Sequence, residues 1–179
     1  MERDFRYIRE LLAEFFNGKQ VQNGLKLIKA NEIAGWEIWL QIEFARFLST
    51  HNSEPEWWRE VPLGYDLRRE KERSFLKPDF LIRKKGWKIG SYAVLEIKQH
   101  PDVGNCMSNM MRDMVKVSKM RQSALEMRTY WALGIFEVEE PEVIREILFN
   151  KADEYNVPVS TAYHLIEKIP KTPYCYLLF

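Results

Sequence analysis

Apolar side chains recur at helical spacing through the first 50 residues. Residues 2–17 carry one every three to four positions, which predicts an amphipathic helix that ends at Asn17-Gly18. Residues 19–30 are ambiguous, and we expect a loop with a short helical turn there. Residues 31–50 predict a stronger helix, because one stripe of large apolar residues runs along it: Trp36, Leu40, Phe44, Phe47 and Leu48.

The spacing changes after the polar break that follows this helix. Residues 57–67 have extended character, and residues 75–83 and 91–99 are rich in β-forming side chains. The glycine- and lysine-rich stretch 84–88 is typical of a hairpin connection between the last two runs. The region therefore predicts three consecutive strands, arranged as a meander.

Helical spacing returns over residues 105–121, where methionines form an apolar stripe that we interpret as core packing. Residues 129–137 suit a buried strand, and a helix is expected from Pro141 to about residue 155. Residues 157–179 are expected to be rich in strands. The pattern predicts one α/β domain over all 179 residues, with a mixed central sheet flanked by helices.

Composition and charge narrow the classes of protein. Lys plus Arg number 27 and Asp plus Glu number 26, so nucleic-acid affinity requires a local basic face. The charged N-terminal segment is not a signal peptide, and no apolar run is long enough to cross a membrane. We therefore expect a cytoplasmic protein without a membrane partner. Cys106 and Cys175 show no metal-binding spacing and are expected to be reduced thiols.

A carboxylate and an ammonium group interrupt the apolar strand predicted over residues 91–99. Side chains alternate between the two faces of a strand, so Glu96 and Lys98 lie together, opposite Leu95 and Ile97. Burying such charges is costly unless they are paired or bind a metal ion. The strand therefore marks a candidate site of chemistry.

Asp79, which follows Pro78 on the preceding predicted strand, supplies a second carboxylate. The hairpin brings that strand beside the one that carries Glu96, and two like charges in one place need a cation to stay ionised. Oxygen ligands of this kind suit Mg²⁺ or Mn²⁺. The alternative is an Asp in a turn and an ordinary Glu/Lys pair on a half-exposed strand.

The segments KPDFLIRKKG and YAVLEIKQ resemble the PD-(D/E)xK nuclease superfamily, over about residues 31–137. The predicted order of helix, three strands, helix and strand is also that of its restriction-endonuclease-like core. Here the core would carry an extra N-terminal helix and a C-terminal helix and strands. The resemblance implies that Asp79, Glu96 and the main-chain carbonyl of Ile97 bind the metal ion. Lys98 would orient the attacking water or help to deprotonate it.

Many members of the superfamily also carry a metal-binding Glu on the first core helix. Two residues in GWEIWLQIEFARFL are candidates. Glu37 is favoured because it lies near the start of the helix, one turn before Gln41. Glu43 falls on the apolar stripe and is the alternative.

Substrate contacts are expected from the end of the motif and from a later helix. Gln99 follows the motif lysine and, by resemblance, touches the substrate or the water. Arg112, Lys116 and Lys119 form a stripe that either follows a phosphate backbone or is a solvated face. Asp113 is expected only to pair with Lys116. A second basic cluster, interleaved with acidic residues, comprises Arg68, Arg69, Lys71 and Arg73.

These observations predict a Mg²⁺- or Mn²⁺-dependent nuclease that hydrolyses phosphodiester bonds in nucleic acid, DNA by resemblance. Nuclease domains that cut both strands often act as dimers, so a homodimer is left open. The alternative is a non-cutting nucleic-acid-binding or protein-interaction protein on the same fold.

Overall fold

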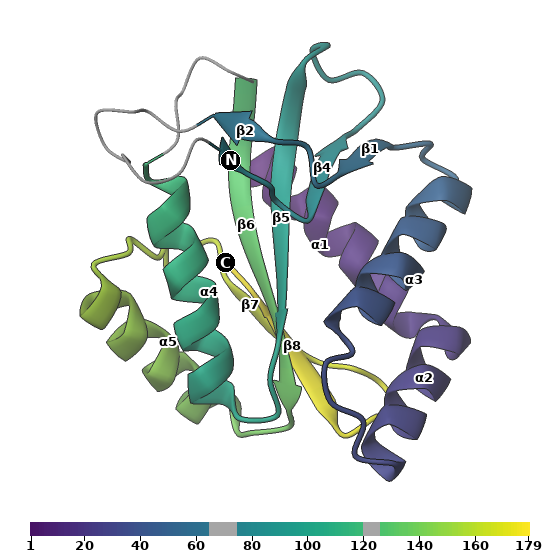
Figure 1. Cartoon of the computed structure of the whole chain (residues 1–179), viewed down its shortest axis with the longest axis vertical. Coiled ribbons are helices and arrows are strands. Elements are labelled where there is room, and N and C mark those ends of the chain that lie inside the picture. The colour runs from purple at the N-terminus through teal and green to yellow at the C-terminus, as the bar shows by residue number, and fades with distance from the viewer. Residues whose placement is uncertain (65–74, 120–125) are drawn as a thin grey trace.

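The computed structural model describes residues 1–64, 75–119 and 126–179, which form five helices and two sheets (Figure 1). The elements in chain order are α1 (Glu2–Asn17), α2 (Lys19–Ala30), α3 (Glu37–Thr50), β1 (Glu56–Arg59), β2 (Leu63–Gly64), β3 (Phe75–Leu76), β4 (Phe80–Arg83), β5 (Ser91–Gln99), α4 (Val103–Val117), β6 (Glu126–Glu137), α5 (Pro141–Tyr155), β7 (Leu165–Lys168) and β8 (Tyr174–Leu178). The basic cluster at residues 68–73 lies outside the described residues, as do the ends of the strand predicted over 57–67 and the helix predicted over 105–121.

The main sheet is mixed, with strand order β1-β4-β5-β6-β8-β7. The predicted meander is confirmed in part: β1, β4 and β5 are antiparallel neighbours, but β2 and β3 come between β1 and β4 in the chain and pair in a separate two-stranded sheet. The β4–β5 hairpin turns through Gly86, whose φ of 90° is a conformation that glycine adopts without strain. β5 and β6 pair in parallel, which requires the crossover that α4 provides.

Helices cover both faces of this sheet (Figure 1). The larger core packs α1, α2 and α3 against the side chains of β4, β5 and β6 that face them, among them Leu95 and Ile97. The second core packs α4 and α5 against the opposite face and contains Cys106, Met107 and Met110. The methionine stripe is thus core packing, as predicted. No helix within the described residues is both long and apolar enough to span a lipid bilayer.

The loop predicted over residues 19–30 was wrong, because this segment is the twelve-residue helix α2. Val21, Leu25 and Ile28 bury one side of it in the larger core. Gly24 weakens the helical signal, but the indole ring of Trp39 lies where its side chain would be, 2.2 Å from an added Cβ. Close packing against α3 therefore overrides the low helix propensity of glycine.

Two helix or strand boundaries also differ from those predicted. The helix expected from residue 31 begins at Glu37, after a turn that places Gly35 at a φ of 69°. The strand expected over residues 75–83 is divided into β3 and β4 by Lys77-Pro78-Asp79. Pro78 cannot donate to a strand ladder, which is consistent with the break. The break frees Asp79 from regular pairing at the point where the candidate chemistry lies.

Candidate active site

Strand β5 extends beyond the end of β4. The backbone N–H groups of β5 that have no partner on β4 donate to carboxylates instead. The last paired residues are Phe80 and Leu95. Farther along β5, the N–H of Ile97 donates to Oδ2 of Asp79 at 2.7 Å, and the N–H of Gln99 donates to Oε2 of Glu37 at 3.3 Å. The carboxylate at the β3–β4 junction and the carboxylate on α3 therefore lie along the same edge of β5.

Glu96 and Lys98 lie beside these carboxylates, on the face of β5 towards α4. Glu96 is only 7% exposed and accepts the N–H of Asp79 at 3.2 Å. The Nζ of Lys98 lies 3.0 Å from Oε1 of Glu96 and 3.7 Å from Oε1 of Glu37. It also donates to the carbonyl oxygen of Ile97 at 3.2 Å. One ammonium group is therefore surrounded by oxygen atoms from two elements.

Asp113 on α4 completes the group, although it was expected only to pair with Lys116. One of its oxygens lies 3.0 Å from the Nζ of Lys98, and the other bonds Lys116. Its side chain is 9% exposed. A sequence signal was available, because Asp113 lies seven residues after Cys106 and three after Met110, on the buried side of the helix. A carboxylate on the buried side of a helix requires a charged or hydrogen-bonding partner on the element against which that helix packs.

The electrostatics of the two strand carboxylates reflect their burial. Burial raises the pKa of Asp79 to about 6, against the opposing effect of the Ile97 N–H and of Lys98. Burial, together with the charge of Asp79, raises the pKa of Glu96 to about 7. Both groups therefore hold protons more readily than ordinary carboxyls. A metal cation bound between the two carboxyl groups would favour their ionised forms.

Lys98 and Asp113 remain charged. Burial alone would lower the pKa of Lys98, but the charges of Glu96, Asp113, Glu37 and Asp79 outweigh it and raise that pKa well above its usual range. Burial alone would raise the pKa of Asp113, but Lys98 and Lys116 hold it below its usual value. Since a protonated amine has no lone pair, Lys98 cannot accept a proton in this arrangement.

The site opens into a cavity of about 400 Å³ with an acidic floor and a basic rim. Glu37, Glu96, Lys98 and Asp113 line the floor, and the lining also contains Leu76 and Asn109. The rim cations are Lys77, Arg112 and Lys116. A polyanion could approach such a rim, because the cations would screen it from the carboxylates beneath.

Three predicted residues lie elsewhere. The side chain of Gln99 lines a different cavity, with His100 and Trp36, and Lys119 is not among the residues that line the acidic one. Glu43 bonds Gln20 on α2 at 3.3 Å and Arg46 at 3.0 Å. The strand alternation that groups Glu96 with Lys98 already assigns Gln99 to the opposite face.

The donor atoms fit a hard divalent cation in their chemistry. They are all oxygens, and four carboxylates with the two ammonium groups of Lys98 and Lys116 carry a formal charge of −2. The hydroxyl oxygen of Tyr130 is buried and has no hydrogen-bond partner among the described residues. Those residues contain no set of three or more His, Cys, Asp or Glu side chains already arranged around one metal position. Lys98 instead contacts the oxygens that a cation would need.

Comparisons with protein-family models, with curated proteins and with solved structures give no match to this chain.

Proposed function

We propose that this protein is a metal-dependent nuclease that hydrolyses phosphodiester bonds. One observation carries the proposal: Glu96 and Lys98 converge with Glu37 and Asp113 at the floor of one open cavity with a basic rim, and Asp79 is hydrogen-bonded to Glu96 beside it. Structural ion pairs do not require three carboxylates within 3.7 Å of one lysine. Burial raises the pKa of Asp79 and of Glu96 in spite of the neighbouring Lys98, and such perturbed carboxyls are typical of functional sites.

The order of elements supports the restriction-endonuclease-like fold as part of this proposal. α3, the meander β1-β4-β5, the crossover helix α4 and the parallel strand β6 follow the order that the PD-(D/E)xK resemblance implies. In this scheme α1 and α2 are N-terminal additions, and α5, β7 and β8 are C-terminal additions.

Each residue of the candidate site has a proposed role. Asp79, Glu96 and the carbonyl of Ile97 would hold Mg²⁺ or Mn²⁺, with Glu37 as the helix carboxylate. A bound ion of this kind supplies an activated water and neutralises charge on the phosphate. Lys98 stays protonated, so it would orient the water and stabilise negative charge that develops at phosphorus rather than act as a base.

The basic rim favours nucleic acid as the substrate. Lys77, Arg112 and Lys116 would contact backbone phosphates on either side of the bond that is cut. DNA rather than RNA follows from the resemblance to PD-(D/E)xK nucleases. The proposal includes a protein that works in the cytoplasm, alone or as a homodimer.

The test is cleavage of supercoiled plasmid, single-stranded DNA and RNA with Mg²⁺, Mn²⁺ or a chelator. Lys98→Ala should slow cleavage by on the order of 10²–10³ because the cation that stabilises the developing negative charge is lost. Binding of Mn²⁺ by the same variant should be unchanged or tighter, because a neighbouring positive charge is removed. Lys26→Ala, an exposed lysine on α2, is the matched control and should cleave like the wild type.

The outcomes separate the two hypotheses. Wild-type rates in Lys98→Ala, with an unchanged circular dichroism spectrum, would remove Lys98 from the mechanism. If no form of the protein cuts any nucleic acid with either ion, the non-cutting binding protein becomes the better account of the fold.

A further inference from the structure

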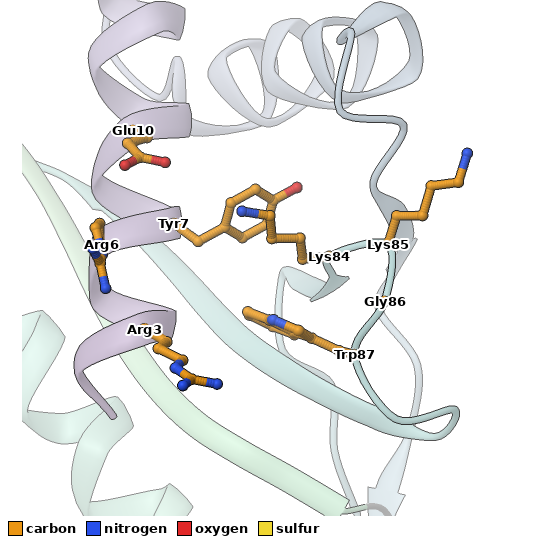
Figure 2. A pocket seen from close by; sticks show the side chains of 8 residues that line it. All are labelled: Arg3, Arg6, Tyr7, Glu10, Lys84, Lys85, Gly86 and Trp87. Atoms are coloured by element: carbon orange, nitrogen blue, oxygen red, sulfur yellow. The ribbon is translucent and has the colours of Figure 1, made fainter.

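A second cavity of about 400 Å³ lies between α1 and the β4–β5 hairpin (Figure 2). α1 contributes Arg3, Arg6, Tyr7 and Glu10, and the hairpin contributes Lys84, Lys85, Gly86 and Trp87. Tyr7 and Trp87 pack against the larger core, on the face of the sheet that α1 covers. The candidate active site lies on the α4 face, so the two cavities are separate and the following inference does not depend on nuclease activity.

The charges around this second cavity are unbalanced. Among the described residues, Arg3, Arg6 and Lys84 form no ion pair with any carboxylate, and the ammonium group of Lys84 lies over the ring of Tyr7. Lys85 is paired with Glu54 at 2.6 Å and points away from the cavity (Figure 2). Against the three remaining cations, Glu10 is the single acidic residue of the lining. The lining therefore carries a formal charge of +2 once the Lys85–Glu54 pair is set aside.

Aromatic rings fix the walls of the cavity. The rings of Tyr7 and Trp87 meet edge to face with centroids 5.6 Å apart, and the hydroxyl of Tyr7 bonds Ser53 at 3.0 Å. Lys84 lies over the Tyr7 ring at 4.8 Å, and Arg128 lies over the Trp87 ring at 4.5 Å. One face of each ring is thus covered by a cation, which leaves charge rather than base stacking as the means of recognition.

Arg128 adds rigidity but no net charge. It forms an ion pair with the buried carboxylate of Asp4 at 2.9 Å, and Asp4 also accepts the hydroxyl of Thr129 at 3.2 Å. This network anchors α1 to β6 beside Trp87. The guanidinium groups of Arg3 and Arg6 therefore project from a helix that is held firmly in place.

We propose that this second cavity binds a phosphate group, either free or at the end of a nucleotide. Two guanidinium groups offer paired N–H donors that match the oxygens of a phosphate, and Lys84 adds a third cation. A doubly charged tetrahedral anion matches the formal charge of +2, whereas a carboxylate monoanion does not. The base of a nucleotide is assigned no stacking contact, because a cation occupies one face of each ring and the two rings meet edge to face.

The experiment is calorimetric titration of the full chain with inorganic phosphate, adenosine monophosphate, adenosine and acetate, at about pH 8 and without divalent ions. Phosphate and adenosine monophosphate should bind with similar affinity, and adenosine and acetate should not bind. Arg3→Gln with Arg6→Gln should weaken phosphate binding at least about tenfold, because two charge-assisted contacts are lost.

Two matched controls locate the site. Arg9→Gln removes the same charge from an exposed position of α1 outside the lining, and Lys85→Gln removes the cation that Glu54 already holds. Each should change phosphate affinity by less than about twofold. Equal losses in Arg9→Gln and in the double variant would overturn the proposal in favour of diffuse charge. Unchanged binding in the double variant, or equal binding of adenosine, would overturn it as well.

Discussion

Replacement of Glu96 by Gln separates a metal-binding carboxylate from a structural ion-pair partner. Glutamine has the shape of a protonated Glu, can still accept the N–H of Asp79, and carries no charge next to Lys98. If Glu96 were present to stabilise the fold through Lys98, its loss should destabilise the protein. If Glu96 is a buried carboxyl kept for a cation, its neutralisation should stabilise the metal-free protein.

The magnitude follows from the pKa of Glu96, which burial and the charge of Asp79 raise from 4.5 to about 7. For a carboxyl whose pKa is higher in the folded state, stability is fully present below the unfolded pKa and declines as the pH rises to the folded pKa. The penalty on the wild type therefore develops between about pH 4.5 and pH 7. A shift of this size corresponds to about 3 kcal/mol above pH 7.

The assay is urea denaturation of wild type and Glu96→Gln, followed by circular dichroism in a chelator at about pH 4 and about pH 8. The two proteins should have equal free energies of unfolding at the lower pH, and the variant should be more stable by about 3 kcal/mol at the higher pH. Addition of Mg²⁺ should stabilise the wild type, by about 2.7 kcal/mol at a hundredfold excess over Kd, but not the variant.

One pattern would refute this reasoning. If Glu96→Gln is less stable than the wild type at the higher pH, and Mg²⁺ stabilises neither, then Glu96 serves the Lys98 ion pair. The candidate site would then be a buried salt-bridge network and not a metal centre.

The other predictions concern the carboxylates that approach from α3 and α4. Glu37→Gln should lower the rate of DNA cleavage, whereas Glu43→Gln should leave it unchanged and affect only stability, because Glu43 bonds residues of α2 and α3. Cleavage kinetics and urea denaturation of both variants test this, and the reverse result would make Glu43 the functional carboxylate. Asp113→Asn should reduce kcat more than it changes KM, because Asp113 acts through Lys98. It should also lower the free energy of unfolding by about 3 kcal/mol, as expected for a broken buried ion pair, and Asp113→Glu should recover part of both. A change confined to KM would mean that Asp113 acts on substrate binding.

Local pattern determined the part of the site that lies on β5. Alternation along a strand placed Glu96 and Lys98 on one face, and the turn at Gly86 returned Asp79 to within hydrogen-bonding distance of Glu96. These relations depend on residues within about 20 positions of one another. A two-residue period and a tight turn are enough to determine them.

Tertiary packing decided which distant side chains join that strand. α2 packs its buried side into the larger core with the ring of Trp39 against Gly24, and no spacing rule reveals that contact. Asp113 reaches Lys98 only because α4 packs back across β5 as the crossover to β6. Glu37 reaches β5 because the strand continues past its partner and leaves the N–H of Gln99 without a strand acceptor. The sequence by itself therefore determined the residues of one strand face, while the acidic surroundings of Lys98 were decided by packing, since they join helices and strands that are far apart along the chain.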